Sequence, residues 1–152
     1  MSDFGKATHA DAELILKLYE LRRESVMRQA RNFIAGYNPQ SADEIVTLIN
    51  SFGSDENAYF RQVTSFWEMA AALVTNGALH EGLFLDTCGE LIFVFAKFQP
   101  FLAEVREKLG NPGFLAKAEE IINHTATAQA RLQAMLARQK KMAERRAQAA
   151  KN

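Results

Sequence analysis

Apolar residues recur along most of this chain at intervals of three and four positions, the spacing of one face of an α-helix. No stretch of four or more residues between turns alternates strictly between apolar and polar positions, so no β-strand is predicted. The pattern therefore predicts an all-α protein. In the first apolar stretch, the residues expected on one helical face are Ile15, Tyr19, Val26, Ala30, Phe33 and Tyr37.

Glycine, proline and capping residues divide this pattern into separate helices. Pro100 lacks a backbone N–H and its ring clashes with the preceding turn, so a kink or restart is expected there. The predicted helices cover about residues 11–35, a short segment at 41–52, 54–76, 83–98 continued over 101–109, and 114–149. They predict an antiparallel helical bundle of four long helices plus one short helix.

The aromatic residues place the core of this bundle in the middle of the chain. Nine of the 11 phenylalanines lie between Phe52 and Phe114, as does Trp67, and no aromatic residue follows Phe114. At 1.5 Å per residue the last helix would be about 54 Å long, against about 30–38 Å for helices of 20–25 residues. Its last four or five turns are therefore expected to project beyond the bundle.

Charge is distributed unevenly, although 18 basic and 18 acidic residues cancel over the whole chain. Residues 1–130 carry a net charge of −6 (11 basic, 17 acidic), and residues 131–152 carry +6 (seven basic, one acidic). The expected organisation is a helical bundle over 1–130 and a basic helical extension over 131–152. The candidate partner-binding residues of this extension are Arg131, Arg138, Lys140, Lys141, Arg145 and Arg146.

The basic extension suggests three interpretations. We favour an interaction or adaptor module that contacts a protein partner, or a second copy of itself, through this helix. Anionic lipid or nucleic acid is an alternative partner, although the extension offers no aromatic side chain for stacking or membrane anchoring. A solvated helix end without a target is the remaining interpretation.

Two carboxylates, Glu68 and Glu90, lie within apolar runs of the third and fourth predicted helices. If they shared a site, their pKa values would be raised and acid–base chemistry would be possible, which gives the hypothesis of a small enzyme. The favoured alternative is structural pairing with arginines of the first helix, such as Arg22 and Arg31. We therefore expect a protein that is not an enzyme.

Other chemistries lack the residues that they need. None of the three histidines follows a glutamate by three positions, and no glycine-rich phosphate loop is present, so neither a metal nor a cofactor is predicted. The single cysteine, Cys88, suits a reducing cytoplasm, where we expect the protein. The longest apolar run, residues 91–96, is far shorter than the about 20 residues that cross a bilayer, so no transmembrane segment is predicted.

Several residues between positions 59 and 122 together form a familiar pattern: Phe66-Trp67-Glu68, Ala70, Leu73, Gly77, Leu83-Phe84, Arg106 and Gly110-Asn111-Pro112. This stretch resembles a bacterial family of small all-helical domains of unknown function. The resemblance implies a helical fold and a bacterial source, and it carries over no catalytic residue. It also matches Glu68 and Arg106 to positions where the family repeats a polar residue, and we expect these two to form an ion pair in the core.

Overall fold

The computed structural model describes residues 5–152, which form nine α-helices and a short 3-10 helix with no strand among them. The predicted all-α class is confirmed. In chain order the elements are α1 (His9–Arg22), α2 (Ser25–Gly36), α3 (Ala42–Asn50), α4 (Asp55–Thr75), α5 (Glu81–Thr87), α6 (Glu90–Phe98), η1 (Gln99–Phe101), α7 (Leu102–Leu109), α8 (Ala116–His124) and α9 (Ala126–Ala149). The 3-10 turn η1 contains Pro100 and interrupts the helix where a break was expected.

The first predicted helix is in fact two helices, α1 and α2, separated at Arg23 and Glu24. Glu24 has an extended ψ of 144°, and its carboxylate accepts hydrogen bonds from the backbone N–H groups of Val26 (3.0 Å) and Met27 (2.9 Å). This cap starts a new helix with a different orientation. Tyr19 and Val26, expected on the buried face, are consequently 53% and 47% exposed.

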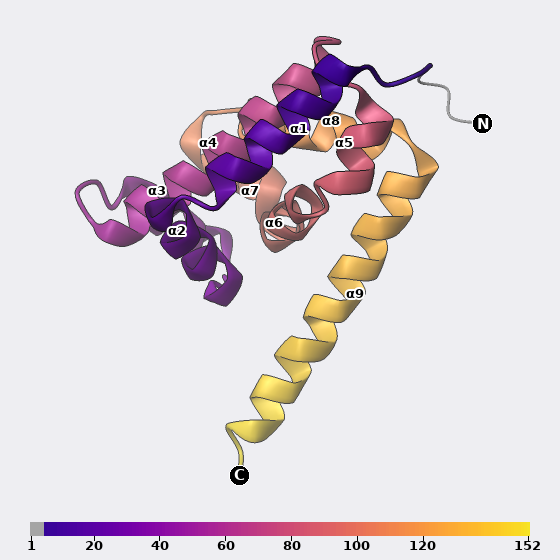
Figure 1. Cartoon of the computed structure of the whole chain (residues 1–152). Helices are drawn as coiled ribbons and strands as arrows, with labels where there is room; N and C mark the ends of the chain where they lie inside the picture. Colours follow the sequence, from indigo (N-terminus) through magenta and orange to yellow (C-terminus); the bar gives the residue numbers. More distant parts are fainter. Residues whose placement is uncertain (1–4) are drawn as a thin grey trace.

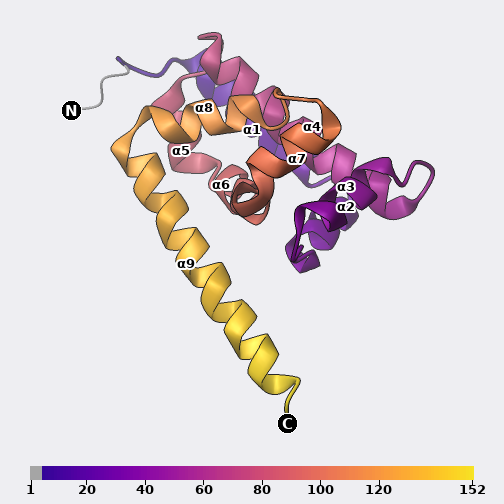
Figure 2. The same cartoon turned by 180° about the vertical axis from the view of Figure 1, so that it is seen from behind.

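The last predicted helix is also divided, at Thr125, which has an extended backbone and ends α8. The Thr125 hydroxyl accepts a hydrogen bond from Ala128 N (3.1 Å) and caps α9. Figures 1 and 2 show α9 leaving α8 at an angle and extending away from the other helices. Every residue from 141 to 152 is exposed. With 24 residues, α9 is about 36 Å long rather than the expected 54 Å.

Helix α4 lies at the centre of the core, packed against α2, α3 and α8. Its Trp67 is 1% exposed and forms edge-to-face contacts with Phe66 and Phe84. Helix α6 packs against both α8 and α9, and seven of its nine residues are buried. Because α4 and α9 are the two long helices of the described chain, the expected arrangement of four long helices is not confirmed.

No helix within residues 5–152 combines the length and the apolar character that crossing a membrane requires.

Candidate binding groove between α2, α6 and α9

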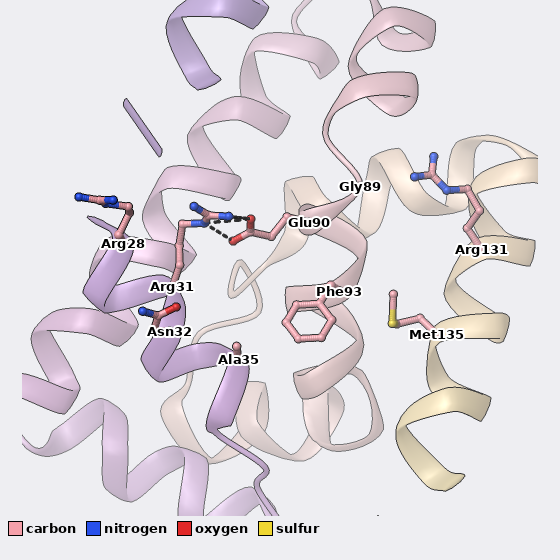
Figure 3. Close-up of a pocket in the computed structure, with 9 residues that line it drawn as sticks. All are labelled: Arg28, Arg31, Asn32, Ala35, Gly89, Glu90, Phe93, Arg131 and Met135. Carbon is pink, nitrogen blue, oxygen red and sulfur yellow. Dashed lines mark hydrogen bonds and ion pairs between the residues drawn. The ribbon is translucent and has the colours of Figure 1, made fainter. Parts of the chain in front are cut away.

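A groove runs between α2 and α9 with α6 as its floor. Its wider part is a cavity of about 600 Å³ around Glu90, and its narrower part is an adjoining cavity of about 220 Å³ around Lys97. The two cavities share Ala35, Phe93 and Met135, so they form one continuous feature, which we call the α2–α6–α9 groove. Figure 3 shows its wider part, with Phe93 lying between Ala35 of α2 and Met135 of α9.

Each of the three helices contributes residues at helical spacing to this groove. On α9 the lining residues extend from Arg131 to Arg146, a distance of about 22 Å along the helix axis. On α6 they extend from Gly89 to Lys97 in the same order, so α6 and α9 run in the same direction along the groove. The groove therefore has the length of about four helical turns along its α9 wall and of about two turns along α6.

The groove combines cationic side chains from all three helices with an apolar floor, which consists of Phe93 on α6 and the neighbouring Ala35 of α2 and Met135 and Met142 of α9. Met142 is 48% exposed. Among the described residues that line the two cavities there are six cationic side chains and one carboxylate. The six cationic residues are Arg28, Arg31, Lys97, Arg131, Arg138 and Arg146.

The one carboxylate, Glu90, is engaged by two arginines. Arg31 donates from Nη2 to Oε2 (2.7 Å) and from Nε to Oε1 (2.9 Å), and Arg22 donates from Nη2 to Oε2 (3.0 Å). The hydrogen bonds and charge of Glu90 raise the pKa of Arg31 despite its partial burial. Because two guanidinium groups surround one carboxylate, the local charge remains positive.

Lys97 lies in the narrower part of the groove, and its ammonium group caps the C-terminal end of α2. Its Nζ donates to the carbonyl oxygens of Ala35 (3.1 Å) and Tyr37 (2.8 Å) and to Oδ1 of Asn38 (3.3 Å). The residue is 7% exposed, and burial, with a smaller contribution from the charge of Arg146, lowers the pKa of Lys97 to about 8. At neutral pH the side chain is still mostly protonated and adds to the positive charge of the groove.

The candidate residues of the basic extension fall into two groups. Arg131 donates from Nη1 to the Leu85 carbonyl (2.7 Å). Its Nη2 lies close to Gly89, so that a side chain at position 89 would place its Cβ only 3.0 Å from this nitrogen. Arg138 and Arg146 line the narrower part of the groove. Lys140, Lys141 and Arg145 are exposed, and none of them is among the described residues that line the groove.

Glu68 and Arg106 do not form the ion pair that the resemblance led us to expect. Glu68 accepts hydrogen bonds from the backbone N–H groups of Ala118 (2.7 Å) and Lys117 (3.2 Å), which caps the start of α8. Arg106 instead donates to Glu119 Oε1 (3.1 Å) and to the Phe114 carbonyl (2.9 Å). Both side chains bind the segment around the start of α8, but they do not bind each other, so the expected ion pair was wrong.

The acid–base hypothesis requires Glu68 and Glu90 to share one site. In the structure Glu68 caps α8, whereas Glu90 is held by Arg22 and Arg31. The thiol of Cys88 is buried, and burial raises its pKa, which disfavours the reactive thiolate. Within residues 5–152 no three His, Cys, Asp or Glu side chains come together in a way that could hold a metal ion.

Sequence reasoning missed the part that Arg28, Phe93, Lys97, Met135 and Met142 play in the groove. On α9 a usable signal was present, because residues 131, 135, 138 and 142 recur at four- and three-residue spacing with alternating basic and apolar character. That α9 turns at Thr125 and faces α2 across α6 is a tertiary feature that this spacing does not contain.

Comparisons with known proteins match the helical domain, which includes α2 and α6 but not α9. Neither the curated proteins nor the solved structures include a match to the chain. A domain of unknown function, DUF4760, matches residues 7–125, which covers α1 to α8 and ends at the residue before α9. The α9 wall of the groove thus lies outside the matched region. Since the match covers well over half of the 152 residues, the chain belongs to the DUF4760 family, as the resemblance to a family of helical domains of unknown function predicted.

Proposed function

We propose that this protein is an interaction module that binds an acidic segment of a partner protein in the α2–α6–α9 groove. The observation that carries this proposal is the charge of the groove: its lining contains six cationic side chains and a single carboxylate, Glu90, which Arg22 and Arg31 already engage. Guanidinium groups bind carboxylates through paired, charge-assisted hydrogen bonds. Arg28 and Arg138, both exposed and on opposite walls, are available for such contacts.

The shape of the site favours a protein segment over a flat anionic surface. The cations that line the groove come from three helices and surround an apolar floor, which a membrane surface or a nucleic acid backbone would not fill. Self-association by pairing two α9 helices would bring together two helices that each carry a net charge of +5, and like charges repel. An acidic protein segment satisfies both the charge and the concave shape.

Two charge reversals on the same helix test this proposal. Arg138 lines the groove and Arg145 does not, although both are exposed on α9. A fluorescein-labelled, glutamate-rich peptide is titrated into the full-length protein and its anisotropy is measured at low and at physiological salt. We expect Arg138→Glu to weaken binding by about tenfold or more, and Arg145→Glu to change it by less than about twofold.

A second candidate function, binding to acidic lipid or nucleic acid, is favoured by the full exposure of residues 141–152 with Lys141, Arg145 and Lys151 among them. Flotation with phosphatidylserine-containing vesicles and a gel shift with a single-stranded oligonucleotide test it, both at two salt concentrations. Two results together would support this function and overturn binding of an acidic protein segment. The first is that Arg138→Glu and Arg145→Glu weaken binding to vesicles or oligonucleotide equally, and the second is that vesicles or oligonucleotide compete with the peptide. A bacterial source and a cytoplasmic location remain predictions.

A further inference from the structure

We infer that the partner segment is an amphipathic α-helix of about four turns, with an apolar stripe flanked on both sides by acidic residues. This inference rests on the proposed function and specifies the chemical class of its partner. It follows from three properties of the groove: its dimensions, its apolar floor and the placement of its cations.

The dimensions of the groove match those of a helix. Two helices, α2 and α9, form its walls, and α6 forms its floor, so the groove occupies the position of an additional helix in a bundle. The lining residues of α9 span about 22 Å, which corresponds to about 15 residues of an α-helix. A helix that lies in a groove between other helices is a recurring mode of peptide recognition.

The floor of the groove offers apolar contacts that a purely electrostatic partner would leave unused. Phe93 lies between Ala35 and Met135 (Figure 3), and Met142 continues this apolar surface toward the C-terminal end of α9. Methionine side chains are flexible and polarisable, and they are frequent on surfaces that accept varied apolar partners. A partner helix would bury Met142, now 48% exposed, beneath its apolar stripe.

The cations lie on both sides of this floor rather than on one. Arg28 projects from α2 and Arg131 lies on α9, on opposite sides of Glu90 (Figure 3). Farther along, Arg138 and Arg146 belong to α9, and Lys97 extends from α6 to the end of α2. A helix with acidic residues on both flanks of its apolar stripe would meet cations on each side. An acidic coil would meet the cations and leave the floor exposed.

Two peptides of identical composition separate these possibilities. Each has about 16 residues of leucine, glutamate and glutamine. In one, the leucines occupy positions i, i+3, i+4 and i+7, so that they form a stripe; in the other, they are distributed around the helix. Both are titrated into the full-length protein by fluorescence anisotropy, and the far-ultraviolet circular dichroism of the mixture reports helix formation. We expect the striped peptide to bind about tenfold more tightly and to gain helicity on binding.

Adjacent substitutions on α9 locate the binding site. Met142→Glu places a carboxylate in the groove, whereas Ala143→Glu places the same group on an exposed position that does not line it. Because both positions are exposed, both variants are expected to fold, which circular dichroism verifies. We expect Met142→Glu to weaken binding of the striped peptide by about fivefold or more, and Ala143→Glu to leave it within about twofold.

Failure of this inference is distinguishable from failure of the proposed function. If both peptides bind equally, if no helicity is gained or if the two substitutions have equal effects, then the helical partner is ruled out. A continued sensitivity to Arg138→Glu would in that case still support an acidic segment in the groove. If neither peptide binds at low salt, where charge attraction is strongest, both the inference and the proposed function are overturned.

Discussion

The guanidinium of Arg31 on α2 contacts both carboxylate oxygens of Glu90 on α6, with an Nη2–Oε2 distance of 2.7 Å. Arg22 of α1 donates to the same Oε2 at 3.0 Å. Two consecutive helices, α1 and α2, thus meet the much later helix α6 at one carboxylate. This junction fixes where α2 lies relative to α6, and therefore sets the position of one wall of the groove.

Glu90→Gln is expected to destabilise the fold. The glutamine keeps the volume but removes the negative charge, and it leaves two guanidinium groups whose side chains are only 16% and 28% exposed without an anionic partner. We expect the free energy of unfolding to fall by about 1–3 kcal/mol, measured by urea denaturation. Glu104→Gln is the control, since Glu104 pairs with Lys108 in an exposed position and its loss is expected to cost less than about 0.5 kcal/mol. Equal losses for the two variants would contradict this prediction.

Lys97 is expected to make stability rise with pH. Its pKa in the folded protein is about 8, whereas the ordinary value is 10.5. Between about pH 8 and pH 10 the unfolded chain therefore binds more protons than the folded one, and the free energy of unfolding increases by about 2 kcal/mol. Denaturation of the original protein and of Lys97→Met at both pH values measures this contribution as a difference.

The original protein and Lys97→Met must be compared because other groups lower the free energy of unfolding at high pH. Burial raises the pKa of Tyr37 to about 12 and also raises the pKa of Cys88, so both groups lower stability as alkaline pH deprotonates the unfolded chain. They are present in both proteins and cancel in the difference. The exposed Lys140→Met should retain the pH dependence of the original protein. If Lys97→Met retains it as well, Lys97 is not its source.

Glu68→Ala is expected to weaken the start of α8. This helix follows Leu115, whose backbone is left-handed (φ 55°), and α8 has no side-chain cap from its own N-cap residue. The Glu68 carboxylate supplies that cap from α4 through Lys117 N and Ala118 N. We expect a loss of about 1–2 kcal/mol in the free energy of unfolding, with a smaller loss for Glu68→Gln, which keeps an acceptor oxygen. Glu120→Ala, at an exposed position of α8, provides the control and should be nearly neutral.

Two truncations of α9 are expected to differ in stability. Removing residues 137–152 retains Leu132, which is 5% exposed, and also Met135 and Leu136, which pack against the core. We expect this truncation to change the free energy of unfolding by less than about 1 kcal/mol while abolishing peptide binding, because it removes Arg138 and Met142.

Removing residues 131–152 additionally deletes Leu132 and the hydrogen bond from Arg131 to the Leu85 carbonyl. We expect this longer truncation to cost about 2–4 kcal/mol, measured by the same urea denaturation. The division of the chain at residue 130 remains a prediction, and these two truncations examine it directly. Equal stability of the two truncated proteins would show that residues 131–136 of α9 add nothing to the core.

Local signals in the sequence were sufficient for the helices whose ends they mark. The short helix predicted from residue 41 does begin there, with the Ser41 hydroxyl accepting a hydrogen bond from Glu44 N (3.2 Å) at the start of α3, and Pro100 does interrupt the helix as predicted. Glu24 and Thr125 were missed as breaks because neither glycine nor proline accompanies them, and helical periodicity continues through both positions. Their capping bonds become decisive only when the helices on either side pack in different directions.

The geometry of the candidate site depends on the two helix breaks that the sequence did not predict, at Glu24 and at Thr125. Charge alone drew attention to residues 131–152, but a single straight helix from 114 would have placed Arg138 and Arg146 on a solvent-surrounded projection. The turn at Thr125 instead brings their side of α9 against α6, opposite α2. Likewise, the partner of Glu68 is a helix start 49 and 50 residues away, which no local pattern in the sequence specifies.

The family match ends at residue 125, and α9 begins at Ala126 behind the capping hydroxyl of Thr125. The matched region therefore supplies α2, α6 and three of the six cations of the groove, whereas the α9 wall, with the other three cations, comes from the stretch after it. Exchanging the segment after Leu136 for a helix of another charge pattern should redirect the selectivity of the groove while the helical domain keeps its architecture. In engineering terms, the part of α9 after Leu136 is exchangeable, so the choice of partner can change without refolding the domain that presents it.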